Sequence, residues 1–244
     1  MMTVQANVTT AARDFIIKSI DRQTKDVKVF KLTPVVAEKL SFKPGMFISL
    51  GFEHDGKKFG PKPYSVSSSP LAADHLEITV KKVGDFTQAL FRLEEGAKVT
   101  VQGPMGKFVL DEPVPKNLVL LAAGTGIAPL LSILRYAQDS GKAGKITLFY
   151  SCKTQNCILH KDEIDHRAQK DDFTVINTLT REPEGSNWQG HSGRICEEML
   201  KRHLHDAKNA HCYICGPAAF VKDVEQTLKD AGVPVANIKK EQWG

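Results

Sequence analysis

The sequence predicts two domains, an antiparallel β barrel or sandwich followed by an α/β domain with a parallel sheet. Up to about residue 110, short runs of alternating apolar and polar residues are separated by Gly, Pro and Asp turns. After a linker at residues 111–117, apolar runs alternate with amphipathic segments, the pattern of βα units. A chain of 244 residues is long enough for two small domains. We place the boundary so that the domains are residues 1–112 and 113–244.

In the first domain, residues 76–80 and 98–102 alternate strictly between apolar and polar side chains. Because side chains of a strand point to opposite faces in turn, this alternation predicts strands with one buried face. Several such short strands separated by turns are typical of an antiparallel barrel or sandwich.

In the second domain, apolar runs and amphipathic segments follow one another in order. The predicted strands are LVLL (118–121), ITLFY (146–150), FTVINTL (173–179) and CYIC (212–215), and the predicted helices are 127–139, 155–170, 194–205 and 217–231. Residues 118–134 carry no charge, but glycines and a proline interrupt them, so we expect a strand, a turn and a helix there and no membrane span.

Composition limits the function and the location. The formal charge of 33 − 28 = +5 is too modest and dispersed for nucleic-acid binding, and it suits an acidic protein partner. Five cysteines do not form a disulfide framework, and the N-terminal residues lack the apolar stretch of a signal peptide. We therefore expect a reducing, cytoplasmic location.

The first chemical signal is the stretch LVLLAAGTGIAP, in which a buried strand ends in Gly124, Thr125 and Gly126 before a helix. Glycines there let the backbone approach a ligand, and a helix N-terminus presents free N–H groups to a pyrophosphate. The alternative is a tight packing turn, and the third glycine of the usual dinucleotide motif is missing.

A second candidate phosphate-binding turn lies in VKKVGDFTQAL, where a strand ends at Gly84 and Thr87 stands near the start of a helix. The Thr87 hydroxyl and nearby N–H groups are candidates to face an anion. The alternative is that Thr87 only caps the helix as its N-cap residue.

Five motifs stand in one order along the chain: KPYSVSSSP (62–70), VKKVGDFT (80–87), GPMGKF (103–108), AAGTGIAP (122–129) and YICGP (213–217). In this order and placement the chain resembles the ferredoxin–NADP reductase-like family of flavoproteins, from about Phe15 to Trp243. The resemblance implies a six-stranded antiparallel flavin-binding β barrel followed by a Rossmann-like α/β nucleotide-binding domain with a parallel sheet. It also implies FAD as cofactor and NADP(H) or NAD(H) as coenzyme.

The resemblance assigns the flavin ring to the stretch Lys62–Ser65, which includes Pro63. It implies that Tyr64 packs on the isoalloxazine and that the Ser65 hydroxyl lies near N5. Lys62 stands where the family has a phosphate-binding arginine, and it keeps the charge but loses the bidentate geometry. We expect Ser67, Ser68 and Ser69 to satisfy their own turn before Pro70.

The flavin phosphates are assigned by the same resemblance to the strand backbone at Thr79 and Lys81 and to Gly84, Phe86 and Thr87. The form PYSVSSSP is similar to that of the FAD-binding branch. FMN remains the alternative.

The resemblance places Cys215, with Gly216 and Pro217 shaping the turn after it, beside the nicotinamide. It places Glu241 near the reacting groups as a polar, proton-handling residue, and Trp243 over the flavin face. The alternative is a C-terminal edge strand whose tryptophan makes ordinary contacts, and Gly244 extends past the family's aromatic terminus. We therefore expect Ser65, Cys215 and Glu241 as the catalytic residues.

The cysteines also permit metal sites. Cys212 and Cys215 form a C-x-x-C pair, but no second pair exists to complete a zinc site. His160 stands where a plant-type iron–sulfur pattern starting at Cys152 and Cys157 would need cysteine. We expect no metal and ordinary packing cysteines.

Coenzyme choice depends on Thr180 and Arg181, which follow the third apolar run of the second domain. They match a Ser-Arg pair that holds the 2′-phosphate in NADPH-using members of the family, and Lys153 falls where such members place another basic residue. The alternative is that Glu182 and Glu184 pair with Arg181, and an acidic ribose site would favour NADH.

We expect an FAD-dependent NAD(P)H reductase that passes electrons to a separate one-electron carrier, first of all a ferredoxin. The lysines expected around the flavin edge are Lys57, Lys58, Lys62, Lys81, Lys82, Lys107, Lys239 and Lys240. The alternative for them is an ordinary solvated surface. The alternatives for the function are a flavin-binding electron-transfer subunit of a larger redox complex and a reductase of free flavin.

Overall fold

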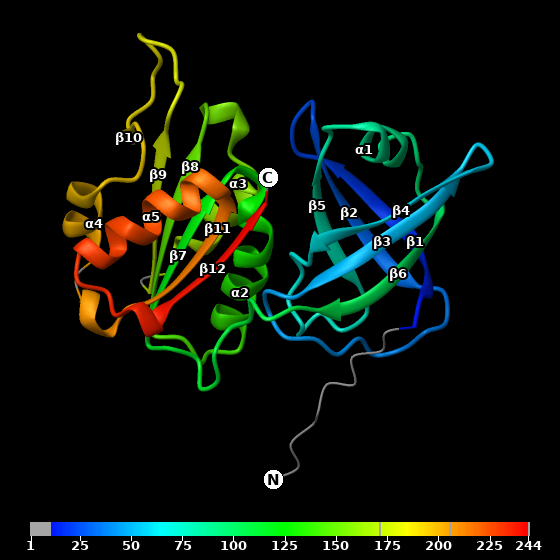
Figure 1. Ribbon diagram of the computed structural model, residues 1–244, viewed down its shortest axis with the longest axis horizontal. Coiled ribbons are helices and arrows are strands. Elements are labelled where there is room, and N and C mark those ends of the chain that lie inside the picture. Colours follow the sequence, from blue (N-terminus) through cyan, green and yellow to red (C-terminus); the bar gives the residue numbers. More distant parts are fainter. Residues whose placement is uncertain (1–10, 171, 205, 244) are drawn as a thin grey trace. The chain divides into compact units, whose positions relative to one another are not determined.

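The protein forms two compact units in a computed structural model that describes residues 11–170, 172–204 and 206–243. One unit ends at Leu110 and also includes Leu131–Asp139, and the other comprises Asp111–Leu130 and the chain from Ser140 onward. Each unit contains one six-stranded sheet (Figure 1). The boundary between residues 112 and 113 stays a prediction. The N-terminal residues 1–10, which the signal-peptide prediction concerns, and Gly244 lie outside the described residues.

The sheet of the first unit is antiparallel, in the order β4-β3-β6-β1-β2-β5. Its strands are β1 (Arg13–Arg22), β2 (Val27–Pro34), β3 (Phe47–His54), β4 (Lys57–Ser65), β5 (Leu76–Lys81) and β6 (Lys98–Met105), and the helix α1 (Asp85–Leu90) follows β5. The alternation seen in the sequence gives this sheet its inner face, since Leu76, Ile78 and Val80 are fully buried.

The curled sheet closes between β4 and β5, the two outer strands of the row (Figure 1). Val66, directly after β4, forms an antiparallel bridge with Ile78 of β5. The Ser67 N–H donates to the Glu77 carbonyl at 2.7 Å, which extends the same junction. The segment after Ser65 therefore forms the junction between the two ends of the sheet, and the predicted antiparallel barrel is confirmed.

The sheet of the second unit is parallel, in the order β10-β9-β8-β7-β11-β12. Its strands are β7 (Asn117–Ala123), β8 (Lys145–Cys152), β9 (Phe173–Leu179), β10 (His191–Ser192), β11 (His211–Pro217) and β12 (Ile238–Trp243). The helices are α2 (Ile127–Asp139), α3 (Lys161–Arg167), α4 (Glu197–His203) and α5 (Ala218–Asp230), of which α2 contributes Leu131–Asp139 to the first unit.

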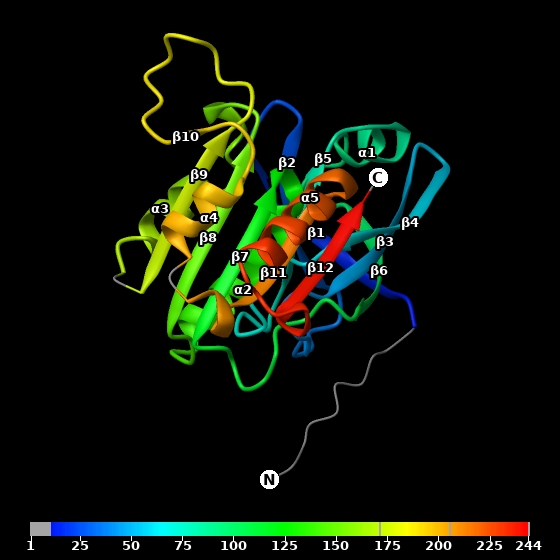
Figure 2. The same ribbon diagram turned by 60° about the vertical axis from the view of Figure 1, so that its left-hand side comes forward.

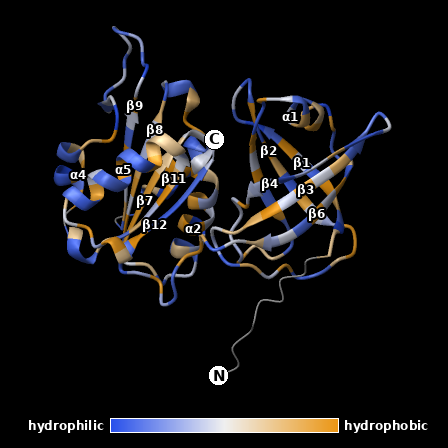
Figure 3. Ribbon diagram, viewed as in Figure 1, coloured by the Kyte–Doolittle hydropathy of each residue, from blue (hydrophilic) through white to orange (hydrophobic). Residues whose placement is uncertain are grey.

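The central strand β7 is apolar from Leu118 onward because both faces of the sheet are covered (Figure 3). Leu118–Ala122 are all fully buried, as expected for a parallel strand. Residues of α4 and α5, among them Met199, Val221 and Leu228, pack on one face of the sheet (Figure 2). The predicted α/β class with a parallel sheet is confirmed.

The helices differ from the predicted segments mainly in length. The predicted helix 155–170 consists of a short 3-10 turn, Gln155–Cys157, and the separate helix α3. His160 precedes α3 with a φ of 53°, so the chain turns there and the two pieces do not join. The segment predicted at 194–205 is helical only over Glu197–His203. In the described ranges, no helix is long and apolar enough to cross a membrane.

Candidate functional site

The stretch predicted to hold the flavin ring forms the end of β4. Tyr64 pairs with Ile48 of β3, and Ser65 pairs with Phe47. Lys62 and Pro63 are exposed, while Tyr64 and Ser65 are half-buried. The strand pairing fixes the backbone of the motif and leaves the Lys62 side chain in solvent, where it is available to a phosphate.

Tyr64 begins a row of aromatic rings on the first unit. Its ring stacks on Phe86 at a centroid distance of 6.0 Å. Phe86 in turn meets Phe52 edge-on at 5.0 Å, and Phe52 stacks on Phe59 at 5.1 Å. Burial raises the pKa of the Tyr64 phenol to about 12, so the ring stays neutral at physiological pH. Sequence reasoning missed Phe52 and Phe59, which alternate with polar neighbours and look like ordinary strand residues.

The Gly84 turn is held by its own threonine. The Thr87 hydroxyl accepts hydrogen bonds from the Val83 and Gly84 N–H groups at 2.8 and 3.1 Å and donates to the Gly84 carbonyl at 2.9 Å. The N-cap of α1 is Gly84 and Thr87 lies inside the helix, so the reading of Thr87 as the N-cap residue is wrong. The hydroxyl shapes the turn and takes the Gly84 N–H, and the space beside the Gly84 Cα stays open, since a Cβ there would meet no atom within 4 Å.

Thr79 and Lys81, the other predicted phosphate contacts, lie on β5 beside β2. Thr79 pairs with Val29 and Lys81 with Val27. Thr79 is buried, whereas the Lys81 side chain is exposed and lies 3.5 Å from the Asp26 carboxylate. The residues assigned from sequence to the flavin ring and phosphates therefore all lie on β4, β5 and the start of α1 of the first unit, and the Tyr64–Phe86 stack joins β4 to α1.

The three serines after Tyr64 and Ser65 do not behave alike. Ser69 satisfies its own turn, as expected, because its hydroxyl accepts the Leu71 N–H at 3.2 Å. The hydroxyls of Ser67 and Ser68 instead bond to Glu77 of β5. The expectation of a self-contained turn is therefore correct for Ser69 and wrong for Ser67 and Ser68, because the strand across the closure supplies their partners.

A pocket of about 260 Å³ lies beside the aromatic row in the first unit. It is lined by His54, Asp55, Lys57, Phe59, Asp85, Gln88 and Arg92. Lys57 lies over the Phe59 ring, with Nζ 5.0 Å from the centroid. This pocket was not predicted from the sequence, because its residues come from a hairpin and a helix about 30 residues apart.

The predicted nucleotide turn occupies the point where the parallel sheet reverses its strand order. The chain runs outward from β7 to β8 and β9 in one direction, and β11 and β12 lie on the other side of β7. Ligands of such sheets bind at the carboxyl ends of the strands beside this reversal. Gly124–Gly126 follow β7 there, and Cys215–Pro217 end β11.

The glycines of this turn have different structural tasks. Gly124 has a φ of +53°, and a Cβ there would meet nothing within 4 Å. At Gly126 a Cβ would lie 2.1 Å from the Cys215 carbonyl oxygen and 2.8 Å from the Trp243 ring. Gly126 is therefore required for packing against β11, while Gly124 leaves its backbone open to a ligand.

A buried tyrosine that sequence reasoning missed holds the turn. The Tyr150 hydroxyl of β8 donates to the Gly124 carbonyl at 3.0 Å and accepts the Leu159 N–H at 3.3 Å. Burial raises the pKa of Tyr150 well above its ordinary value, so the hydroxyl keeps its proton for Gly124. Tyr150 stands within the apolar run ITLFY, where nothing marks it as more than a core residue.

Cys215 and Glu241 are neighbours in the sheet. Cys215 pairs with Ala122 of β7 on one side and with Glu241 of β12 on the other. Burial, together with the Glu241 carboxylate, raises the pKa of the Cys215 thiol well above its ordinary value. A thiol that stays protonated serves as a small polarizable contact and not as a nucleophile.

The C-terminal aromatic residue lies at the same strand ends. Trp243 pairs with Pro217 and is 40% exposed, with its ring edge beside Gly126. Gly216 is closed in by the Phe220 ring, which a Cβ would approach to 2.6 Å. The second unit thus gathers the predicted residues of β7, β11 and β12 around one point.

The predicted coenzyme-selecting residues are held together by backbone hydrogen bonds. The Thr180 N–H donates to the Cys152 carbonyl at 2.9 Å, and the Arg181 N–H donates to the Lys153 carbonyl at 2.8 Å. Arg181 and Lys153 are exposed. Glu182 accepts hydrogen bonds from Gln155, both from its N–H at 2.9 Å and from its side-chain amide at 2.8 Å.

The cysteines contain no sign of a metal centre. The described residues hold no group of three or more His, Cys, Asp or Glu side chains that could bind a metal. Cys212 lies in the apolar core of the second unit, and burial raises its pKa to about 12. Cys152 is also buried, and all five cysteines are free.

These features fit a flavin and a nicotinamide nucleotide. A flat conjugated ring suits the Tyr64 face, and phosphates suit the Lys62 charge and the open space beside Gly84. A pyrophosphate suits Gly124, where the space beside a left-handed turn is open at the start of a 13-residue helix.

Two protein-family models match the chain, one in each half. The oxidoreductase FAD-binding domain matches residues 14–110, and the oxidoreductase NAD-binding domain matches residues 120–226. The gamma subunit of sulfhydrogenase 2 from Pyrococcus furiosus is 32% identical over 237 residues, covering 93% of this chain and 81% of that protein. The reductase subunit of glycine betaine monooxygenase from Chromohalobacter salexigens is 31% identical over 229 residues, covering 91% of this chain and 62% of that protein.

A solved structure supports the same conclusion. The ferredoxin NADP+ reductase from Neisseria gonorrhoeae, crystallised with bound FAD and NADP, superimposes with a TM-score of 0.79 at 26% identity and covers 95% of this chain and 98% of that chain. The protein is therefore an FAD- and NAD-binding oxidoreductase that transfers electrons to a partner. The chain belongs to the ferredoxin reductase-like family of flavoproteins.

Proposed function

We propose that the protein is an FAD-dependent NAD(P)H reductase that passes electrons singly to a separate ferredoxin. Bound FAD would supply the redox chemistry by accepting a hydride from the nicotinamide and releasing its two electrons one at a time. The protein's own residues orient the reactants. Tyr64 supports the flavin ring, Ser65 donates a hydrogen bond near N5, and Cys215 contacts the nicotinamide edge.

Glu241 completes this proposed set. It stands beside Cys215 in the sheet, half-buried, at the carboxyl end of β12. A carboxylate in that position would handle a proton during electron transfer while Cys215 remains protonated. Trp243 lies beside Gly126 and would cover the approach to the nicotinamide position.

The observation that carries the ferredoxin assignment is the distribution of lysines. Lys81, Lys239 and Lys240 form ion pairs with Asp26, Asp111 and Glu225, so they offer little charge to a partner. Of the eight lysines expected at the flavin edge, the five that form no ion pair in the described part of the chain are all exposed: Lys57, Lys58, Lys62, Lys82 and Lys107. All five belong to the first unit, and such a set suits an acidic redox protein.

The purified protein tests this proposal directly. We expect a yellow protein that releases FAD on denaturation and reduces an added ferredoxin with NADPH, at a rate that falls as salt is raised because salt screens the lysines. The matched measurement replaces ferredoxin with a small dye acceptor, whose reduction should depend little on salt. A protein that reduces the dye but no ferredoxin would contradict the assigned partner.

A second candidate function is an electron-transfer subunit of a larger redox complex. The observation in its favour is the 32% identity to a sulfhydrogenase gamma subunit, of which this chain covers 81%. Such a subunit would bind FAD but show little dye reduction alone. Dye reduction by the isolated chain therefore separates the two functions.

We further propose that NADPH is the preferred coenzyme. Arg181 is exposed and takes part in no ion pair among the described residues, while Glu182 is engaged by Gln155. Lys153 adjoins Arg181 through the backbone hydrogen bond at the ends of β8 and β9. Two cations at the ends of neighbouring strands suit a 2′-phosphate.

Replacing Arg181 with alanine tests the coenzyme preference. The change should weaken NADPH by about 1.5–3 kcal/mol, the range for a hydrogen bond to a charged group, and leave NADH nearly unchanged. Steady-state kinetics with both coenzymes measures this. Equal losses for NADPH and NADH would show that Arg181 does not read the 2′-phosphate.

A further inference from the structure

The serine segment, Ser67–Ser69, is more deeply buried than a loop of its composition normally is. Ser67, Ser68 and Ser69 are 0%, 2% and 6% exposed. The segment begins two residues after Ser65 and closes the barrel against β5. Because buried polar groups need hydrogen-bond partners, each hydroxyl and carbonyl of the segment must be satisfied from nearby.

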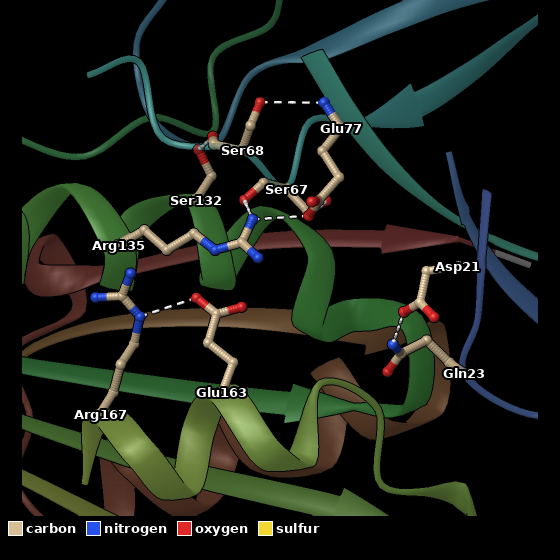
Figure 4. Close-up of polar contacts among 9 residues, drawn as sticks. All are labelled: Asp21, Gln23, Ser67, Ser68, Glu77, Ser132, Arg135, Glu163 and Arg167. Atoms are coloured by element: carbon tan, nitrogen blue, oxygen red, sulfur yellow. Dashed lines mark hydrogen bonds and ion pairs between the residues drawn. The ribbon is translucent and has the colours of Figure 1, made fainter. Parts of the chain in front are cut away.

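Glu77 of β5 satisfies the two hydroxyls that face it. The Ser67 hydroxyl donates to the Glu77 carboxylate at 2.9 Å, and the Glu77 N–H donates to the Ser68 hydroxyl at 3.1 Å (Figure 4). The carboxylate itself is largely buried, with 17% of the side chain exposed. A buried carboxylate requires a cation nearby.

Helix α2 supplies that cation and the remaining donors. Arg135 donates from one nitrogen to the Glu77 carboxylate at 2.7 Å and to the Ser67 carbonyl at 2.8 Å. Ser132 donates to the Ser68 carbonyl at 2.6 Å (Figure 4). Residues three apart lie on one face of a helix, so a single face of α2 holds two consecutive carbonyls of the segment.

These contacts constrain the flavin motif from its C-terminal side. The backbone of Tyr64 and Ser65 is paired with β3, and the chain that leaves Ser65 is fastened by Ser132 and Arg135. The Arg135 side chain is 13% exposed, so solvent competes little for its hydrogen bonds. Loss of Arg135 would leave a buried carboxylate and a buried carbonyl short of a donor.

We propose that Arg135 and Ser132 are positioning residues for flavin binding and hydride transfer, because they hold the serine segment that orients Tyr64 and Ser65. This inference rests on the proposed roles of Tyr64 and Ser65. Neither residue belongs to a motif of the family resemblance, and both lie on a helix assigned from sequence to the other domain.

The test compares Arg135→Met with the matching variant of an ion pair in the second unit. Arg167 donates to Glu163 at 2.9 Å on α3, and its side chain is 16% exposed, close to the 13% of Arg135 (Figure 4). Arg167→Met is therefore the control. Each variant is purified with FAD, and its FAD Kd, its single-turnover flavin bleaching by NADPH and its Tm are measured.

We expect Arg135→Met to raise the FAD Kd and slow bleaching by about tenfold to 10²-fold, since a small misplacement in a reactive site has effects of that size. Ser132→Ala should have an effect of a few fold in the same direction, because the Glu77 ion pair remains, and Arg167→Met should change both by less than about twofold. Arg135→Lys keeps a cation for Glu77 and should recover part of the loss.

Several outcomes would overturn the inference. If Arg135→Met lowers the Tm while the Kd and the bleaching rate stay at wild-type values, the cluster only stabilises the fold. If Arg135→Met does not fold, wild-type values in both Ser132→Ala and Arg135→Lys decide against the proposal. If Ser65→Ala and Tyr64→Ala bind FAD and are bleached by NADPH like wild type, the proposed flavin site is wrong and the inference is wrong with it. If those two variants are defective but Arg135→Met is not, only the positioning role is rejected.

Discussion

The two glycine-containing turns assigned to phosphates are stabilised in opposite ways. The turn at Gly84 is held by Thr87, three residues away in the chain. The turn at Gly124 is held by Tyr150, 26 residues away on the neighbouring strand. The first turn is a local structure, and the second depends on assembly of the sheet. The difference predicts that changes around Gly124 affect stability and binding together, while changes around Gly84 affect mainly binding.

The largest contrast should come from alanine at two glycines. Gly126→Ala forces a Cβ to 2.1 Å from the Cys215 carbonyl, whereas Gly84→Ala places a Cβ in open space. We expect Gly126→Ala to destabilise the fold by about 1–3 kcal/mol and to lower kcat/KM for NADPH by about 10²-fold. Gly84→Ala should change the free energy of unfolding by less than about 0.5 kcal/mol.

Urea unfolding and steady-state kinetics measure both variants. The FAD affinity of Gly84→Ala is measured as well. We expect weaker FAD binding without a loss of stability, because the added methyl group would occupy space left for a phosphate. Equal stability losses for the two alanine variants would show that the two glycine turns do not differ in the way they are stabilised.

The next largest effect should come from Tyr150→Phe. The change removes the side-chain donor to the Gly124 carbonyl, which keeps the Ile127 N–H, and leaves the Leu159 N–H without its acceptor. We expect a loss of about 1–3 kcal/mol in the free energy of unfolding and a rise of about tenfold in KM for NADPH, with the FAD Kd unchanged.

Tyr213→Phe is the matched control for Tyr150→Phe. The Tyr213 hydroxyl also bonds a residue far away in the sequence, accepting the Asp111 N–H and donating to the Asp111 carboxylate, both at 2.9 Å, and these two hydrogen bonds run to a residue outside the glycine turns. We expect a similar loss of stability with KM unchanged. A rise in KM in both variants would mean that general loosening, and not the Gly124 contact, weakens the nucleotide.

A smaller effect is expected at Thr87, where the support is local. Thr87→Val keeps the shape of the side chain but removes the hydroxyl that serves two N–H groups and one carbonyl. We expect a loss of about 1 kcal/mol in stability and a weaker affinity for FAD, with KM for NADPH unchanged. Thr87→Ser should restore FAD affinity, and titration of the apoprotein with FAD measures it.

These contrasts explain which parts of the molecule the sequence predicts. The strands, the parallel sheet and the position of the glycine turns follow from local patterns, such as the alternation at residues 76–80 and the apolar run before Gly124. The aromatic row, Tyr150 and Arg135 could not be predicted in the same way. Each depends on at least one partner more than about 20 residues away, and the neighbouring residues in the sequence indicate only a core or helix-surface position.

The smallest expected effect is a pH dependence at Asp111. Burial opposes ionisation of this carboxyl, but hydrogen bonds from Lys239 and Tyr213 and the Lys239 charge outweigh it and hold the pKa below its ordinary value of 3.8. A carboxyl whose pKa is lower in the folded state contributes stability above its unfolded pKa and loses it as pH falls.

Asp111→Asn tests this contribution. The stability difference from wild type should be constant above about pH 5 and shrink as pH falls below about 4. Its size should be at most about 1 kcal/mol, because 43% of the Asp111 side chain is exposed. A difference that stays the same down to pH 2 would show that Asp111 stabilises the fold without its charge, and coenzyme kinetics should not change at any pH.

The position of β4 in the sheet gives its lysines a second role, which does not depend on a redox partner. β4 is an outer strand of the row and pairs along its length with β3, because the bridge that closes the barrel lies beyond its end, at Val66. An outer strand edge of this kind offers backbone groups to the edge of another molecule and so promotes aggregation. Pro61 and Pro63 lack N–H donors, and Lys57, Lys58 and Lys62 place charges along the same strand. Neutralising these lysines would expose β4 to pairing between copies of the protein, so colloidal solubility depends on the same residues that would receive an acidic carrier.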